Sequence, residues 1–253
     1  IIILLYRVGV EIRMDKKSRP EQWQEMFSSW DRWTPPARPS QNDIECMETF
    51  VKQRFSDLST KKALILGCTA EFRDMLARNN VDVTVLDINP EMVETMNTLL
   101  KEGINPKEQI VIGDWITTQV PENNFDIIMS DFAINQLPLQ LWEIMLPKVN
   151  NLLTKDGVFV HRSYFDVSKT APSIEEWKAK WITNKEMTLR DHNEMWWNAI
   201  FQYTYDPQTK EIGNHRRKEF WDKVVEGTSP DSRERQVLKK HLEIFDYFEK
   251  SWT

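Results

Sequence analysis

The chain has 253 residues, enough for one large domain or for one domain with a substantial cap. Apolar residues make up 40% and charged residues 28%, which is ordinary for a globular protein and argues against disorder of the whole chain. A formal net charge of −6 and a pI near 5.4 provide no general surface for neutralising phosphates, so nucleic acid is an unlikely partner. Two cysteines indicate no disulfide framework. The four histidines have no metal-ligand spacing, so we expect no metal.

Residues 1–60 are predicted to form an N-terminal helical and aromatic segment. Its apolar start, residues 1–5, is far shorter than the ~20 residues that span a bilayer. It also lacks the basic leader and cleavage site of a signal peptide, so we expect no membrane insertion and a cytoplasmic location. Residues 1–13 are either an extension ahead of Met14 or include an edge strand over residues 2–8.

Two helices are predicted in the rest of this segment. Aromatic residues at spacings of three and four indicate a helix over 20–33. Ser40, with Asp43 three residues later, forms a capping-box variant that opens a second helix reaching about Leu58. The prolines of residues 35–40 separate the two helices by a rigid extended turn.

The chain from residue 61 to residue 165 alternates short apolar runs, typical of strands buried on both faces, with helical patterns. Strands are predicted over 63–66, 81–86, 109–112, 125–130 and 158–162. Helices are predicted over 71–79, from an Asn89 cap and Pro90 toward Gly103, and over 139–153, with a turn at Asp156-Gly157. This alternation indicates βαβ units and a mostly parallel sheet, and therefore the α/β class.

Residues 166–253 are predicted to form a helical cap or extension. Helices are expected near 173–184, 190–204, 216–226 and 231–250. A hairpin over 198–212 is the alternative to helix in the second of these stretches. We find no convincing strand pair after residue 165 that would close the sheet, so we expect closing strands to be absent or supplied otherwise, for instance by residues 2–8.

Three features follow consecutive predicted strands, at the sheet edge where open α/β proteins bind ligands. Gly67 permits close backbone approach in a strand-to-helix turn. Asp87, 20 residues later, ends the second strand and suits hydrogen bonding to ribose hydroxyls. Asp114 and Trp115, after the third strand, offer a carboxylate for an exocyclic amine and an indole for stacking on a purine. Together they predict a nucleoside-containing ligand.

On these residues the sequence resembles the class I S-adenosylmethionine-dependent methyltransferases. The matching stretches are 63–71, 85–92, 113–115, 125–131 and 152–160. The resemblance covers roughly residues 61–165 and implies a Rossmann-like, doubly wound core between the N-terminal helical segment and the C-terminal helical cap. It also implies a methyltransferase that uses S-adenosyl-L-methionine.

The resemblance implies roles for the residues around the nucleoside. Asp87 would hold the ribose, and Ile88 and Met92 would flank the adenine. Asp114 would meet the adenine amine, with Trp115 beside it.

The methionine end of the cofactor would lie against the first loop and the stretch after the fourth strand, where the substrate would also enter. The residues concerned are Gly67, Cys68, Thr69, Ser130, Asp131 and Gln136. A subgroup of small-molecule methyltransferases has a similar Leu-Gly-x-Thr-x-Glu loop behind a Pro-rich segment. That likeness implies that Trp33 and Arg38 lie near the cofactor.

The sequence departs from the family pattern in its first loop, where Cys68 and Ala70 stand at positions often taken by glycine. The stretch 130–133, Ser-Asp-Phe-Ala, also lacks the Asn-Pro-Pro-aromatic tetrad of many methyltransferases that act on nucleobase or glutamine amino groups. Together with the acidic pI, this favours a small-molecule acceptor over nucleic acid.

Methyl transfer from a sulfonium is an in-line displacement, so the protein must align the nucleophile, exclude water and, for an alcohol or phenol, remove a proton. His161, at the end of the fifth predicted strand, is the first candidate for a catalytic base, and His192 is the second.

Three other functions stay open at this point. The chain could modify a protein or a nucleic acid, or it could be a non-catalytic module that keeps the fold and binds the nucleoside or a partner chain. A nicotinamide oxidoreductase is disfavoured because the G-x-G-x-x-G fingerprint is absent. The sequence alone does not predict the oligomeric state.

Overall fold

The computed structural model describes residues 38–137, 139–163, 173–182 and 214–240, together with residues 35, 187, 188, 211 and 212 and six single positions from 191 to 206. The expected helix over 20–33, the apolar start of the chain and most of the 190–204 stretch lie outside the described residues.

Strands and helices alternate through the first half of the described chain. In order they are α2 (Gln41–Arg54), β1 (Lys62–Leu66), α3 (Ala70–Arg78), β2 (Asp82–Asp87), α4 (Pro90–Asn97), β3 (Glu108–Ile112), β4 (Phe125–Asp131), the short 3₁₀ helix η2 (Ile134–Gln136), α5 (Leu139–Leu152) and β5 (Leu153–Arg162). The strands form one sheet of order β3-β2-β1-β4-β5, with every pair parallel. The predicted Rossmann-like α/β fold is confirmed.

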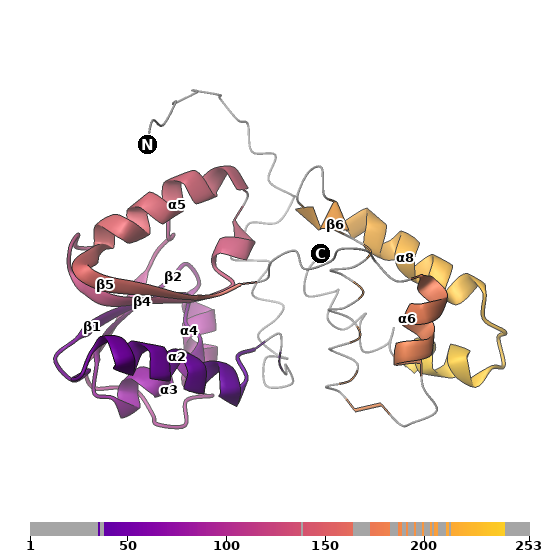
Figure 1. Ribbon diagram of the computed structural model, residues 1–253, viewed down its shortest axis with the longest axis horizontal. Coiled ribbons are helices and arrows are strands. Elements are labelled where there is room, and N and C mark those ends of the chain that lie inside the picture. The colour runs from indigo at the N-terminus through magenta and orange to yellow at the C-terminus, as the bar shows by residue number, and fades with distance from the viewer. Residues whose placement is uncertain are drawn as a thin grey trace.

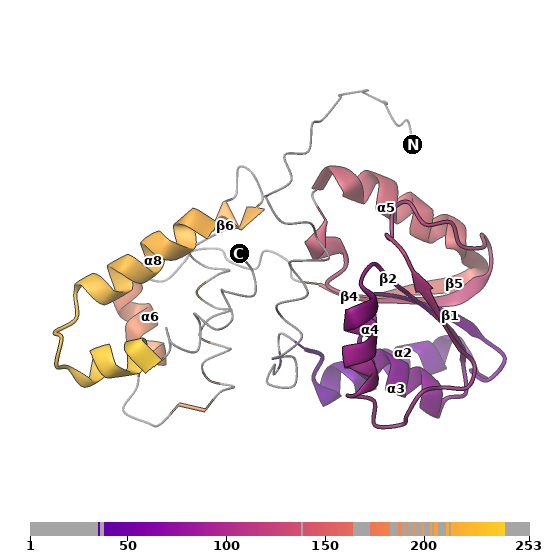
Figure 2. The same cartoon turned by 180° about the vertical axis from the view of Figure 1, so that it is seen from behind.

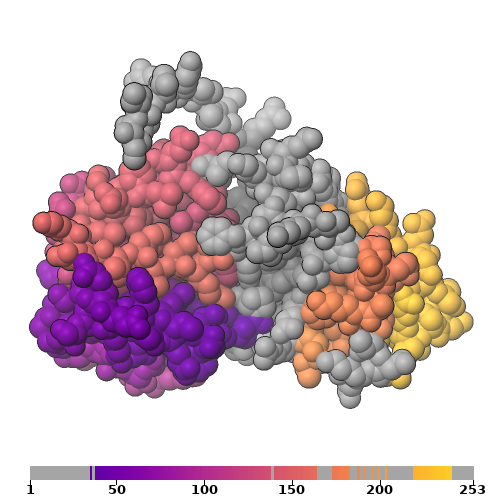
Figure 3. Space-filling model, viewed as in Figure 1, coloured from indigo at the N-terminus to yellow at the C-terminus, as the bar shows by residue number. Residues whose placement is uncertain are grey.

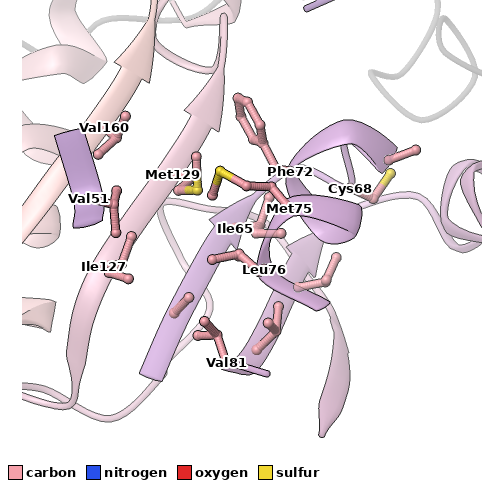
Figure 4. Close-up of a cluster of buried hydrophobic side chains, with 14 of the residues drawn as sticks. Val51, Ile65, Cys68, Phe72, Met75, Leu76, Val81, Ile127, Met129 and Val160 are labelled. Atoms are coloured by element: carbon pink, nitrogen blue, oxygen red, sulfur yellow. The ribbon is translucent and has the colours of Figure 1, made fainter. Parts of the chain in front are cut away.

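The sheet is covered on both faces: α2 and α3 lie on one side and α5 on the other (Figures 1 and 2). Successive residues of a strand point to opposite faces. Ile65 and Ile127 therefore belong to the core under α2 and α3, and Leu64 and Ile128 to the core under α5. Figure 4 shows the first of these cores, with strand side chains packed against Val51 of α2 and against α3. The all-apolar strands follow from this double burial.

Helix caps form where the sequence indicates them. Ser40 and Asp43 make a reciprocal capping box at α2. The Asn89 side chain accepts hydrogen bonds from Glu91 N and Met92 N at the start of α4. These caps satisfy backbone N–H groups of the first turn and so fix where the two helices begin.

Helix α4 ends at Asn97, so its predicted extension toward Gly103 is wrong. The Thr98 N–H donates to the Met96 and Thr95 carbonyls at the end of the helix, and the Asp74 carboxylate of α3 then accepts hydrogen bonds from the backbone amides of Lys101 and Glu102, which hold the following chain. Gly103 takes a φ of +74°, which ends the turn.

The predicted turn at Asp156-Gly157 is instead a bulge within β5. Leu153 pairs with Phe125 and Val158 with Ile127, so β5 uses more residues than β4 over the same length. Gly157 is required there, since a Cβ would come within 2.9 Å of the Phe125 carbonyl oxygen.

The described C-terminal part contains α6 (Ile174–Trp181), β6 (Tyr205–Asp206), β7 (Glu211–Ile212), α8 (Asn214–Glu226) and a helix over 233–240. Strands β6 and β7 pair antiparallel in a sheet of their own, so the second half of the 198–212 stretch forms strands, while its described positions 199 and 203 are helical. In the described chain neither strand joins the main sheet. The helices have a separate core, which includes Trp177, Phe220 and Trp221, and they gather at the end of the molecule away from α2 (Figure 3).

The helices of the described chain are all too short or too polar to cross a membrane.

Candidate functional site

The ends of β1, β2 and β3 meet at one edge of the sheet because the three strands are parallel neighbours. Gly67 N donates to the Leu86 carbonyl at 2.9 Å, and Gly113 N donates to the Asp87 carbonyl at 2.9 Å. The indole Nε1 of Trp115 donates to the same Leu86 carbonyl at 2.8 Å. The three features that the sequence singles out are therefore brought together.

The first loop turns at Gly67, whose φ is +100°. Among the described residues, a Cβ there would meet only Trp115 Cζ2, at 3.8 Å, so the glycine leaves an open cradle beside the indole. Cys68 is buried in the core under α3, so the side chain that replaces a family glycine leaves the cradle clear. Thr69 is the N-cap residue of α3 but makes no side-chain cap hydrogen bond.

The Asp87 carboxylate ends β2 and is 9% exposed. Its Oδ1 accepts a hydrogen bond from Asn89 N at 2.8 Å. Burial raises the pKa of Asp87, while hydrogen bonds from Asn89 N, the Cys68 thiol and Ile88 N oppose that rise. The carboxylate is thus held in one orientation by donors from both flanking loops. Ile88 is half-buried beside it, whereas Met92 lies in the core under α4.

The loop after β3 is held by hydrogen bonds between its own residues and by a lysine of α5. Asp114 Oδ1 accepts hydrogen bonds from Ile116 N at 2.8 Å and Thr117 N at 3.1 Å. Lys148 of α5 donates from Nζ to the carbonyls of Ile116 and Thr118 at 3.0 and 2.6 Å. Lys148 was not predicted from the sequence, because nothing in a helix pattern indicates which loop a lysine will reach.

The ends of β4 and β5 carry a buried polar pair. Ser130 Oγ and His161 Nδ1 are hydrogen-bonded at 2.6 Å, and the two residues face each other in the strand register. Within the described part of the chain, the buried Nε2 of His161 has no hydrogen-bond partner, and Phe159 stacks on the ring. Burial, with the nearby Arg162 guanidinium, lowers the pKa of His161 to about 4, so the imidazole is neutral at pH 7.

Next to this pair, Arg162 forms a two-pronged ion pair with Asp131, with Nε to Oδ1 at 2.6 Å and Nη2 to Oδ2 at 3.0 Å. Burial raises the pKa of Asp131 to about 6, and the guanidinium acts in the opposite direction. Phe132 follows with a φ of +55°, and its ring lies 4.3 Å under the Arg162 guanidinium. Gln136, half-buried at the end of η2, donates its backbone N–H to the Phe132 carbonyl.

Arg38 lies against the start of α3, directly after the first loop. Its Nε and Nη2 contact Glu71 Oε1, in the first turn of α3, at 2.8 and 2.6 Å. The other proposed residue of its segment, Trp33, and the second candidate base, His192, lie outside the described residues. The sequence alone assigns no function to Arg162 or Glu71. Arg162 directly follows the candidate base His161, and Glu71 follows the first loop, which is predicted to contact the cofactor.

Comparison with known proteins bears on the part of the chain that forms this sheet. Residues 64–161 match the model of a family described as a methyltransferase domain. No curated protein matches the chain.

Solved structures resemble the chain at low sequence identity. The CcbJ methyltransferase from Streptomyces caelestis is 18% identical, with a TM-score of 0.47; the match covers 57% of this chain and 58% of that one. The PH0226 protein from Pyrococcus horikoshii OT3 is 20% identical, with a TM-score of 0.45, over 58% of this chain and 76% of that one. Phosphoethanolamine N-methyltransferase 1 from Haemonchus contortus, in complex with phosphoethanolamine and S-adenosylhomocysteine, is 18% identical, with a TM-score of 0.44, over 56% and 30%. At these identities and TM-scores the likenesses carry no argument about the acceptor or the activity.

Proposed function

We propose that this chain, whose residues 64–161 match the model of a methyltransferase domain, is a class I methyltransferase that transfers a methyl group from S-adenosyl-L-methionine to a small-molecule acceptor. One observation carries the proposal. The glycine turn after β1, the carboxylate after β2 and the Asp-Trp loop after β3 converge on one edge of a parallel sheet, where such a fold binds its ligand.

The residues at this edge fit the cofactor. The open cradle at Gly67 accepts a group that a larger side chain would exclude. The Asp87 carboxylate, held by its neighbours' N–H groups, would accept hydrogen bonds from the ribose hydroxyls. The loop of Asp114 and Trp115, clamped by Lys148, would bound the adenine, with Ile88 on the other side. The stretch from Ser130 to Gln136, which ends β4 and continues into η2, would line the methionine end.

When bound, S-adenosyl-L-methionine supplies an electrophilic methyl group, so the chain's own residues must align the acceptor and handle its proton. When His161 donates from Nδ1–H to Ser130 Oγ, the lone pair of the buried Nε2 can accept a proton. A base whose pKa is about 4 is weak.

The net charge of the chain and the residues at the carboxyl end of β4 both favour a small-molecule acceptor. The net charge of −6 disfavours a polyanion. Strand β4 ends at Asp131, whose carboxylate is paired with Arg162, and Phe132 and Ala133 follow. The strand end therefore lacks the Asn-Pro-Pro-aromatic tetrad of many methyltransferases that act on nucleobase or glutamine amino groups. We also propose a cytoplasmic location, in keeping with the two cysteines, which are both free thiols.

The test is a calorimetric titration of the full chain with S-adenosylmethionine, S-adenosylhomocysteine and NADH in parallel. We expect micromolar binding of both S-adenosyl ligands and none of NADH. Absence of binding would contradict the cofactor assignment.

The acceptor requires a second experiment, in which the chain is incubated with S-adenosylmethionine and pools of small phenols, alcohols and amines, and S-adenosylhomocysteine release is measured. Release with a small molecule supports the proposal. Binding without release from any pool would favour the non-catalytic module, and release only with a protein or RNA would contradict the acceptor class.

A further inference from the structure

The segment that precedes α2 is fastened across the ends of β4 and β5 by Arg162. Nη1 of Arg162 donates to the Arg38 carbonyl at 3.2 Å, while Nε and Nη2 hold the two oxygens of Asp131. The Arg162 side chain is 12% exposed and that of Asp131 8%, so this junction is shielded from water. Asp43 of α2 also faces the guanidinium, at 3.9 Å. Arg162 of β5 therefore contacts the end of β4 and the start of the α2 segment, and these three parts of the chain lie far apart in the sequence.

The Arg38 side chain extends from this junction to the first turn of α3. Its guanidinium pairs with Glu71, and the two side chains keep 18% and 22% exposure. A positive and a negative group thus lie side by side next to the Gly67 loop. The amino-acid end of the cofactor carries a carboxylate and an ammonium group, and this pair of charges is complementary to both. The N-terminal end of α3 further favours the carboxylate.

From this arrangement we infer that Arg162 is a positioning residue: it holds the Arg38 backbone so that the Arg38–Glu71 pair recognises the amino-acid end of the cofactor. The inference rests on the proposed function. Arg162 itself touches neither ligand nor reacting atoms in this scheme and acts through Arg38. Lysine at position 162 would keep the charge but lose the planar fork that binds Asp131 and the Arg38 carbonyl at once.

The test compares two ligands that differ at the amino-acid end. S-adenosylhomocysteine carries that end, whereas 5′-methylthioadenosine has the same nucleoside without it. We expect Arg162→Lys and Arg38→Met each to weaken S-adenosylhomocysteine binding about tenfold or more and to change 5′-methylthioadenosine binding less than about twofold. Arg54→Lys is the matched control, because Arg54 forms an exposed ion pair with Asp156, and we expect it to change neither affinity.

Several outcomes would overturn the inference. Equal weakening of both ligands by Arg162→Lys would mean that the arginine only supports the fold, and unchanged S-adenosylhomocysteine affinity would mean that it has no such role. Thermal unfolding of each variant identifies loss of structure, and Arg38→Met, at a partly exposed side chain, still tests recognition if Arg162→Lys does not fold. Failure of the wild-type chain to bind either ligand would refute the proposed function itself, and the inference with it.

Discussion

Replacing Asp87 by alanine tests the nucleoside site directly. The carboxylate is buried at the carboxyl end of β2 and is oriented by the Asn89 amide, so in the proposed complex it offers preorganised acceptors to the ribose. Hydrogen bonds to a charged group contribute about 1.5–3 kcal/mol. We therefore expect Asp87→Ala to cost about 2–3 kcal/mol of S-adenosylhomocysteine affinity, which is about a 30- to 140-fold rise in Kd.

Calorimetric titration provides the measurement, and the same strand provides the control. Asp82 lies at the other end of β2, where the strand begins. Asp82→Ala therefore removes an identical side chain from the strand without touching the proposed site. We expect its affinity to match that of the unaltered chain. If folded Asp87→Ala also bound with unchanged affinity, or if both variants lost affinity equally, the ribose could not lie at Asp87.

Three further predictions concern stability and pH. Glu108→Gln should lower the free energy of unfolding by about 3–5 kcal/mol, because it leaves the guanidinium of Arg73 charged and unpaired in the core; urea denaturation measures this, and a loss below about 1 kcal/mol would refute it. Gly67→Ala should cost about 1–2 kcal/mol through its left-handed backbone rather than through a clash, since the nearest atom is at 3.8 Å; an unchanged melting temperature would contradict this. The lowered pKa of His161 means that the unfolded chain binds this proton first, so its contribution to stability is present above about pH 6.5 and is lost as the pH falls toward 4. His161→Gln should flatten the stability profile over that window, and an unchanged slope would show that other groups produce it.

The sheet and its ligand edge are predictable because their signals are local. Four apolar residues from Ala63 to Leu66 can only form a doubly buried strand in this setting, and the Ser40 and Asn89 caps act within three residues. The sequence order alone places Asp87 and Gly113 together, since parallel strands bring their carboxyl ends to one edge.

Other features depend on contacts that no local pattern contains. The chain after α4 is held by Asp74 of another helix, and Gly157 lies where the Phe125 carbonyl of the neighbouring strand leaves no room for a side chain. The sequence carries a helix pattern at the first position and a turn pattern at the second, and contacts with other elements of the fold override both.

The same distinction divides the site itself. The proposed nucleoside half, around Asp87 and Trp115, is held by hydrogen bonds within one strand-end loop and between neighbouring strand ends, so sequence spacing is enough to bring these residues together. The amino-acid half depends on Arg162, whose contact with Arg38 joins residues 124 positions apart, and no spacing rule predicts such a pair. Because that half draws on the segment before α2, we expect changes ahead of residue 40 to act on recognition of the amino-acid end and to leave the nucleoside end unaffected. The S-adenosylhomocysteine and 5′-methylthioadenosine pair of ligands separates these two effects in a single assay.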